Sequence, residues 1–505
     1  MAEPLIWLRE LDSARIQRYH YYTIVVAGLG LLTFGYSFFC GFLVIILLRC
    51  MKAPSIPSPG DFYPVVHPSV DVSALGGTLA GQLIFGLCCD KFGRKIVYEF
   101  ILTLMVVCCC CSGLSFGTKV EAVLVTLYFF RFCLGFLGGA TYSLAATFIS
   151  ENANKRKRGM FIAAGFAMQG LGTLFAGIAV IIISSTTIHK YHDFYWRILL
   201  MSVAVLPFGA YLLLKTMPET PRFTNFVSNN PSQAASDAYG ALNLQLPSGQ
   251  ENAQHLNVGQ NLTYHLFSRE FWSSHGWHLL GIAGSSLVLG ITSLSSLLFL
   301  NLIFRSKGLI PPAKGIDAIH EYQEIAKLQT LLLLPSFIGS MFAVFFIDCI
   351  GRVPIQNLGF FFKAVFMFAA ALSTPWEKES NISGLCVLYV LDNLFSSAGP
   401  NATVFALPVE IFPTKFRATC HAISVGAGKF GEIVAVILFR FVAHNDHKII
   451  KILFFGLCVS NILAIIMTLF VPESKGKTLE ELSGENEDHG ARATELARSG
   501  RIAAV

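Results

Sequence analysis

Twelve apolar runs divide the chain, and each is about as long as a helix that crosses a lipid bilayer. They lie near residues 22–48, 71–89, 96–116, 122–150, 160–184, 195–215, 278–304, 326–350, 353–373, 383–411, 418–443 and 449–471. Of the 505 residues, 54% are hydrophobic and only 13% are charged, which is more apolar surface than a soluble core can bury. The pattern predicts an all-α membrane protein, whose first apolar run is too long to be the core of a cleavable signal peptide.

Positive charges between the apolar runs predict how the chain is oriented in the membrane. They follow the second and fourth runs and precede the first, as in Arg94, the cluster at 155–158 and Arg15. By the positive-inside rule, both termini are expected in the cytoplasm. We expect a cytoplasmic N-terminus (1–21), a six-helix bundle (22–217), a cytoplasmic linker (218–277), a second six-helix bundle (278–471) and a cytoplasmic tail (472–505). These flanks account for the net charge of +6, so the charge predicts no nucleic-acid partner.

The same charged residues recur at matching places in the two halves of the chain. They are Asp90, Arg94, Glu151 and Arg158 in the first half, and Asp348, Arg352, Glu410 and Arg417 in the second. Such a repeat predicts twelve transmembrane helices in two pseudo-symmetric bundles, with a substrate bound between them near the midplane. Because contacts at helix ends can break when bundles rock, we expect these eight residues to act in gating.

Several longer motifs resemble known transporters. GQLIFGLCCDKFGRK at 81–95 is similar to the signature loop of the major facilitator superfamily. SENANKRKRG at 150–159, FIAAGFAMQG at 161–170 and GPNATVFALPVEIFPTKFRATCHAIS at 399–424 resemble the plant and fungal phosphate:proton symporters of that superfamily. The resemblance covers essentially the whole chain. It implies the major facilitator fold and an inorganic phosphate transporter of the plasma membrane that works by alternating access, with phosphate and possibly protons as its partners and with no cofactor.

The resemblance also implies substrate-binding residues. Tyr142, Gln169 and Asn401 match the Tyr, Gln and Asn with which this family holds phosphate. The cost of an amide in lipid favours a cavity-facing Gln169, although a hydrogen bond to another helix would also satisfy it. Lys429 is the nearest fixed cation that could neutralise an anion, and it could equally pair with Glu432 three residues later.

The carboxylates that carry protons in the resembled family are missing here. The matching positions hold Phe34, Ser37, Thr141 and Gly290. Ser286 stands where the family has a Trp, and it is a further substrate-binding candidate. New charges stand at Lys363, Asp392 and Glu432, where the family usually has none. We expect Lys363 and Asp392 to form a structural buried pair, with a relocated proton relay through Asp392 or Glu432 as the alternative.

Three functions remain open. The first is phosphate transport with altered proton coupling. The second is facilitated passage of another small polar solute, suggested by hydroxyls at Ser286, Thr292, Ser293, Ser295 and Thr141. The third is a transport-incompetent receptor or partner subunit, suggested by the joint loss of the coupling acids. The spans hold no metal cluster or nucleophile–base pair, so we expect neither an enzyme nor a metal site. Asn381 begins a glycosylation sequon in a predicted outer loop.

Overall fold

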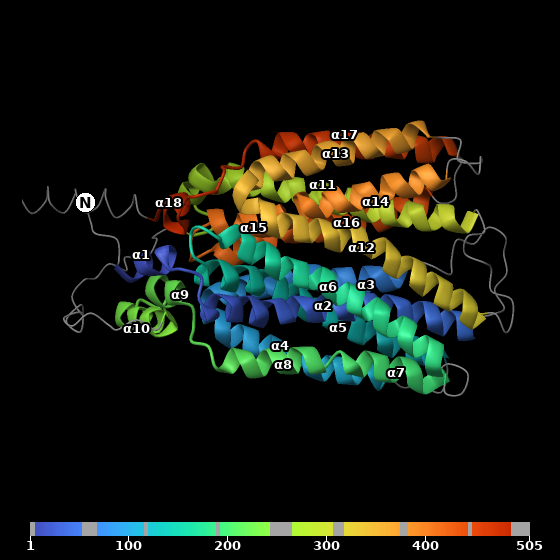
Figure 1. Cartoon of the computed structure of the whole chain (residues 1–505), viewed down its shortest axis with the longest axis horizontal. Helices are drawn as coiled ribbons and strands as arrows, with labels where there is room; N and C mark the ends of the chain where they lie inside the picture. Colours follow the sequence, from blue (N-terminus) through green and yellow to red (C-terminus); the bar gives the residue numbers. More distant parts are fainter. Residues whose placement is uncertain are drawn as a thin grey trace, which may run out of the picture.

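The protein is described by a computed structural model that covers residues 6–52, 68–115, 120–187, 192–242, 265–306, 318–373, 382–442 and 447–485. Within these ranges every regular element is an α-helix, and the long helices run side by side along one axis (Figure 1). The Asn381 sequon and the tail beyond Glu485 lie outside the described residues.

The first half of the chain forms the N bundle. Its helices are α2 (Arg18–Lys52), α3 (Pro68–Phe92), α4 (Arg94–Gly113), α5 (Val120–Asn152), α6 (Arg158–Thr187), α7 (His192–Ser202) and α8 (Val205–Lys215). The last two follow each other along one span, which runs from Trp196 to Lys215. The N bundle thus supplies six rods, one for each of the first six predicted spans.

The second half forms the C bundle. Its helices are α11 (Arg269–Ser306), α12 (Ala318–Ile350), α13 (Arg352–Leu372), α14 (Ile382–Ala398), α15 (Pro400–Ile411), α16 (Arg417–Val442) and α17 (His447–Thr468). The break between α14 and α15 falls at Gly399, before Pro400, because proline has no N–H to donate and its ring disfavours a helical residue before it. The pair α14–α15 therefore fills the place of one span.

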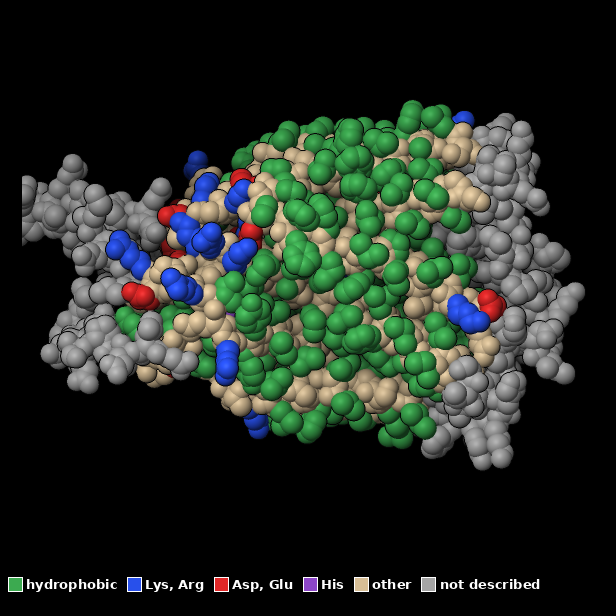
Figure 2. Space-filling view, viewed as in Figure 1, with side chains coloured by type: hydrophobic (Ala, Val, Ile, Leu, Met, Phe, Trp, Pro, Cys, Tyr) green, Lys and Arg blue, Asp and Glu red, His purple; other side chains and the backbone are tan. Residues whose placement is uncertain are grey.

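Ten of the described helices or helix pairs are long and apolar enough to cross a membrane. The helix α3 and the broken pair α14–α15 complete the twelve rods, as the twelve apolar runs predict. Figure 2 shows apolar side chains over the middle of the molecule and charged ones at its ends. Large apolar residues such as Phe345 and Ile452 are 68% exposed, which suits a surface that faces lipid.

Four short helices gather at one end of the bundles, on the left in Figure 1. They are α1 (Ile6–Ser13), α9 (Pro221–Phe226), α10 (Pro231–Leu242) and α18 (Leu479–Ser483), and we call this the linker end. The buried Arg222 of α9 pairs with Asp12 of α1 at 2.8 Å and with Glu480 of α18 at 2.9 Å. The segment that connects the bundles is thus partly folded, and it fastens α1 and α18 to the linker end.

Candidate functional site

Asp90, near the end of α3 in the N bundle, caps the start of α16 in the C bundle. Its carboxylate accepts hydrogen bonds from the backbone N–H groups of Ala418 at 3.2 Å and Thr419 at 2.8 Å, and from the Thr419 hydroxyl at 2.7 Å. The first N–H groups of a helix lack partners within the helix and carry partial positive charge, so a carboxylate is stabilising there. The predicted contact of Asp90 with a neighbouring helix terminus is therefore present.

Asp348 makes the equivalent contact in the opposite direction. This residue of α12, in the C bundle, accepts a hydrogen bond from the backbone N–H of Met160 at the start of α6, in the N bundle, at 2.9 Å. Its other oxygen pairs with Arg352 at 2.9 Å. Each bundle therefore caps a helix of the other, which is what the internal repeat predicts for related positions.

Buried ion pairs surround these two caps. Arg94 and Glu151 pair within the N bundle at 2.9 Å, and Arg352 and Glu410 pair within the C bundle at 2.8 Å. Arg417 of the C bundle reaches Glu151 across the interface at 3.0 Å. The eight predicted gating residues all lie in this layer, which we call the linker-end latch: Asp90, Arg94, Glu151, Arg158, Asp348, Arg352, Glu410 and Arg417.

The symmetry of the latch is incomplete. Arg417 pairs with Glu151, but the related Arg158 donates to the backbone oxygen of Lys477 at 3.3 Å. Arg94 also donates across the interface, to the carbonyl of Thr414 at 2.9 Å. The latch therefore joins the bundles through side chains and through backbone of the loops that precede α16 and α18.

The bundles also touch at the end opposite the latch, which we call the far end. Gln323 of α12 donates to the carbonyl of Ser184 on α6 at 3.0 Å. Tyr322 and Ile325 of α12 pack in one apolar cluster with Val180 of α6. The bundles therefore contact each other on both sides of the central residues.

Two of the implied substrate-binding residues meet in the middle of the bundles. The Tyr142 hydroxyl of α5 hydrogen-bonds to the side-chain carbonyl of Gln169 on α6. Lys429 of α16, in the C bundle, has its ammonium 5.8 Å from the centre of the Tyr142 ring. It also pairs with Glu432 at 2.6 Å, as the spacing along the helix allows. A cation of one bundle thus lies beside a phenol and an amide of the other.

Aromatic rings surround Tyr142. Phe34 of α2 and Phe405 of α15 each meet its ring edge to face, with ring centres 5.4 Å and 5.6 Å away. On the latch side, the ring of His421 lies 5.3 Å from Phe405, and its Nδ1 is 3.2 Å from the hydroxyl of Ser143 across the interface. No sequence pattern pairs His421 with Ser143 across the bundles, although a His within an apolar run was a visible signal.

Asn401 lies one turn before Phe405 on α15, and it belongs to a chain of hydroxyl groups. Its amide nitrogen donates to the hydroxyls of Ser396 and Ser397, at 3.3 Å each. The Ser396 hydroxyl is 3.3 Å from that of Ser293 on α11. Asn401 therefore lies next to the Tyr142 cluster, with Phe405 between them. Its amide nitrogen is held by two serine hydroxyls of the C bundle.

The other predicted positions lie in packed interfaces. The Ser286 hydroxyl of α11 packs against Gly428 of α16, the residue before Lys429. A Cβ atom at Gly428 would lie 2.6 Å from that hydroxyl. At Gly290 a Cβ atom would overlap the carbonyl oxygen of Gly428, so the two helices approach too closely there for a side chain. Ser286 thus borders the position of Lys429, and Gly290 serves helix packing.

Thr141 points away from the interface between the bundles. It is fully buried, and its hydroxyl donates to the carbonyl of Leu137 on its own helix at 3.0 Å and lies 3.6 Å from the sulfur of Met105 on α4. Nearby in the N bundle, the guanidinium of Arg131 donates to the carbonyl of Ser37, and its remaining nitrogens have no partner among the described residues. The hydroxyl of Thr141 therefore does not line a passage between the bundles.

The predicted pairing of the new C-bundle charges is present. Lys363 of α13 and Asp392 of α14 lie 3.2 Å apart, and both side chains are buried. Lys363 also donates to the Ser293 hydroxyl at 3.4 Å. The pair is therefore connected to the hydroxyl chain that ends at Asn401.

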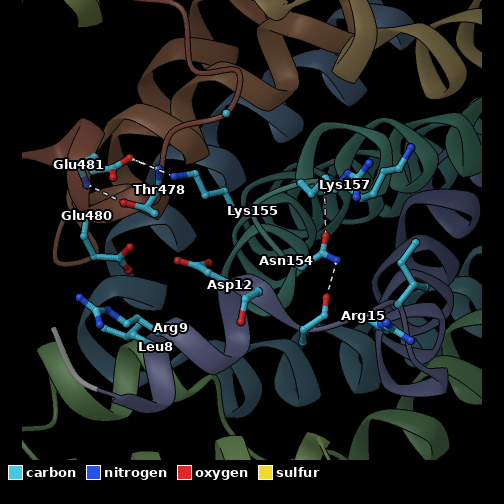
Figure 3. Close-up of a pocket in the computed structure, with 15 residues that line it drawn as sticks. Leu8, Arg9, Asp12, Arg15, Asn154, Lys155, Lys157, Thr478, Glu480 and Glu481 are labelled. Atoms are coloured by element: carbon cyan, nitrogen blue, oxygen red, sulfur yellow. Dashed lines mark hydrogen bonds and ion pairs between the residues drawn. The ribbon is translucent and has the colours of Figure 1, made fainter.

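A separate hollow of about 1090 Å³ lies at the linker end, between α1, the loop after α5 and α18 (Figure 3). Lys155 and Glu481 pair across it at 3.5 Å, and Asn154 donates to the carbonyl of Ala14 at 2.9 Å. The Glu481 side chain also receives the N–H of Thr478 as part of a capping box, which holds the pKa of that carboxyl below its usual range. The hollow opens outside the latch and does not reach the central polar cluster.

Comparisons with known proteins agree with this architecture. Residues 23–485 match the family described as sugar (and other) transporters. Inorganic phosphate transporter 1-4 of Arabidopsis thaliana is 43% identical, over 96% of this chain and 97% of its own length. The low affinity inorganic phosphate transporter 1 of Petunia hybrida is 42% identical over the whole of both chains.

The fold is that of solved transporters of the major facilitator superfamily. The proton:xylose symporter XylE bound to 6-bromo-6-deoxy-D-glucose superposes with a TM-score of 0.72 at 22% identity, over 92% of this chain and 98% of that one. XylE from E. coli in its inward open conformation superposes less well, with a TM-score of 0.58, 20% identity and coverage of 92% and 99%. The chain belongs to the sugar (and other) transporter family of the major facilitator superfamily, among the relatives of the plant inorganic phosphate transporters.

Proposed function

We propose that this protein carries inorganic phosphate across the plasma membrane by alternating access, with the linker end and both termini in the cytoplasm. The observation that carries the proposal is the central cluster, in which Lys429 of one bundle faces Tyr142 and Gln169 of the other. The relatives named for phosphate transport share 42–43% of their residues with the chain over almost its whole length, which supports phosphate as the substrate.

The cluster offers the chemistry that a phosphate anion needs. A hydrogen phosphate carries acceptor oxygens, and the phenol of Tyr142 and the amides of Gln169 and Asn401 can donate to them. Lys429 supplies a positive charge, which makes such hydrogen bonds stronger. In the closed structure its ammonium is paired with Glu432 at 2.6 Å, so the anion would take the place of that carboxylate. Ser286, beside Gly428, would border the same space.

Alternating access would use the latch. Rocking of the bundles must break the contacts of Asp90 and Asp348 with the opposite bundle, while the pairs Arg94–Glu151 and Arg352–Glu410 can stay within their own bundles. The contacts of Asp90, Asp348 and Arg417 across the interface support a structure closed toward the cytoplasm. Phosphate would enter from the outside and leave when the latch opens.

Uptake of labelled phosphate by cells that lack their own carriers tests the proposal. We expect saturable uptake that unlabelled phosphate displaces and that xylose does not. Uptake of another small solute with no competition by phosphate would contradict the choice of substrate. A protein that reaches the cell surface and carries nothing would contradict transport itself.

A further inference from the structure

Lys363 and Asp392 form an ion pair inside the C bundle. Their side chains are 0% and 5% exposed and 3.2 Å apart, halfway along the membrane-spanning helices α13 and α14. Two charges at that depth lose more hydration energy than a single pairing returns, so such residues usually have a functional role. The second oxygen of Asp392, Oδ1, is buried and has no hydrogen-bond partner among the described residues.

A small cavity of about 40 Å³ adjoins this carboxylate. Its lining includes Met367 and Ala370 of α13 and Leu385 and Leu388 of α14, all of which lie between Asp392 and the far end of their helices. A cavity of this volume holds about one water molecule, and Ser296 and Asp392 supply polar atoms in its wall. The carboxylate therefore adjoins a small space on the side of the pair that leads toward the far end.

On its other side the pair leads to the phosphate site. Lys363 donates to the Ser293 hydroxyl at 3.4 Å, Ser293 and Ser396 lie 3.3 Å apart, and Asn401 donates to Ser396 at 3.3 Å. Each link joins a different helix of the C bundle. Three polar contacts thus connect the pair to Asn401.

Few other titratable groups face Asp392. Tyr389 lies on its own helix one turn earlier and lines the same cavity. Among described residues, the helix α11 contributes hydroxyls here, while the charged residues of α12, α15 and α17 lie near the ends of those helices. The charges at this depth of the C bundle are those of Lys363 and Asp392, and those of Lys429 and Glu432 on α16, which pair with each other at 2.6 Å.

We propose, on the basis of the proposed phosphate transport, that Asp392 is the proton-binding carboxylate of this transporter and that Lys363 couples the proton to the anion. A proton that enters from outside adds to Oδ1 of Asp392, and the neutral pair becomes a pair with one positive charge. Lys363 keeps its proton and its contact with Ser293. The new positive charge attracts a phosphate anion toward Asn401, and by linkage the bound anion makes the proton bind more tightly.

Proteoliposomes that contain the full-length protein test this inference. The outside pH is kept constant, so that the same ionic forms of labelled phosphate are offered. The inside is buffered to the same pH or to a more alkaline one. For the unaltered protein we expect an inside that is one pH unit more alkaline to raise phosphate accumulation about tenfold, because one pH unit contributes about 1.4 kcal/mol for each coupled proton. In Asp392→Asn we expect flux to persist while the effect of the gradient disappears.

Two further variants guard against trivial outcomes. If Asp392→Asn does not fold because Lys363 is left unpaired, the double variant Lys363→Met, Asp392→Leu removes both charges and must also lack the gradient effect. Glu324→Gln is the matched control, because it removes a carboxylate paired with Lys327 at 2.8 Å on the exposed end of α12. It should keep the gradient effect in full.

Two results would overturn the inference. The first is a gradient effect that survives in Asp392→Asn; its loss in His421→Gln would then place the proton between the bundles. The second is phosphate flux in the unaltered protein without any gradient effect, which leaves phosphate transport standing. The absence of phosphate flux from a folded protein would instead overturn the proposed function, and this inference with it.

Discussion

Asp90 and Asp348 occupy equivalent places in the two bundles, and each caps the first turn of a helix in the opposite bundle. The contact distances are 2.8 Å to the N–H of Thr419 and 2.9 Å to that of Met160. Both contacts join parts that must separate if the linker end opens. They are therefore interactions that exist in one state only, which is what a conformational gate requires.

Replacing one cap should open the latch more often. Asp90→Asn replaces a charged acceptor by a neutral one in three hydrogen bonds, and we expect a total loss of about 2 kcal/mol, so the open fraction should rise roughly thirtyfold. The test uses a cysteine at position 150 as a probe of opening. The Ser150 hydroxyl is buried 3.3 Å from the carbonyl of Val409 across the interface, so a thiol in Ser150→Cys becomes accessible only when the bundles separate. We expect faster alkylation of this thiol than in a protein that keeps Asp90.

Two backgrounds are needed for the alkylation experiment. The protein without Ser150→Cys gives the reaction of the native thiols, of which Cys349 is exposed. Glu99→Gln is the control variant, because Glu99 makes only a 3.9 Å, partly exposed contact with Lys95. Equal alkylation rates with and without Asp90→Asn would show that this cap does not hold the latch.

The two glycines before α4 and α13 should not tolerate a side chain. Gly93 and Gly351 have φ values of 103° and 110°, and a Cβ there would lie 2.6 Å from Glu219 and 2.9 Å from Glu473. Both glutamates accept N–H groups at the start of the following helix. We expect Gly93→Ala or Gly351→Ala to cost about 1–3 kcal/mol, seen as a lower Tm in detergent.

Gly209→Ala on α8 is the control for that series. Nothing lies within 4 Å of the added atom, and the backbone there is helical. Alanine is the better helix former, so this variant should leave Tm unchanged or raise it. An equal decrease in Tm in all three variants would mean that the positive φ and the contacts with the glutamates do not stabilise the starts of α4 and α13.

A carboxylate cannot simply be returned to position 290. Any side chain at Gly290 overlaps the backbone of Gly428, so Gly290→Asp should separate α11 from α16 and remove most folded protein. Gly284→Ala on the same helix is the comparison, because its Cβ would meet only the flexible side chain of Met467 at 3.3 Å. Size-exclusion chromatography after heating measures the fraction of folded, monodisperse protein for both variants. A monodisperse Gly290→Asp protein would refute this packing.

The tail contact should depend on pH. Burial raises the pKa of the Glu480 carboxyl, but Arg222 outweighs burial and holds it below the usual 4.5. A carboxyl with a lowered pKa in the folded state stabilises above its unfolded pKa, and that stabilisation is lost as pH falls through the folded value. Glu480→Gln should therefore cost about 3 kcal/mol at neutral pH, and the difference in Tm should shrink below pH 4.5. A difference that stays constant with pH would exclude this explanation.

The sequence predicts the spans and the charged ends because both depend on local patterns. Lipid thickness sets the length of the apolar runs, and the break before Pro400 follows from the missing N–H of proline. The repeat of Asp90 and Asp348 also predicted equivalent contacts, since equal places in two bundles face equal partners. The architecture could therefore be predicted from the chain alone.

The central site could be predicted only in part. Lys429 faces Tyr142 from another bundle, and no spacing along the chain encodes that distance. The environment of Thr141 could not be predicted either, because the rotation of α5 decides whether its hydroxyl faces the space between the bundles or Met105. The contact between His421 and Ser143 likewise depends on how the bundles dock. These positions follow from packing between helices distant in sequence.

The most direct measurement is the KM for phosphate uptake in Gln169→Leu against the unaltered protein at equal surface expression. Loss of one amide donor to the anion should raise KM about tenfold. Gln233→Ala, an exposed change on α10, is the control and should leave KM unchanged. A saturable phosphate uptake with that raised KM is the predicted result. No phosphate uptake by the unaltered protein, or an unchanged KM in Gln169→Leu, would contradict a phosphate site at this cluster.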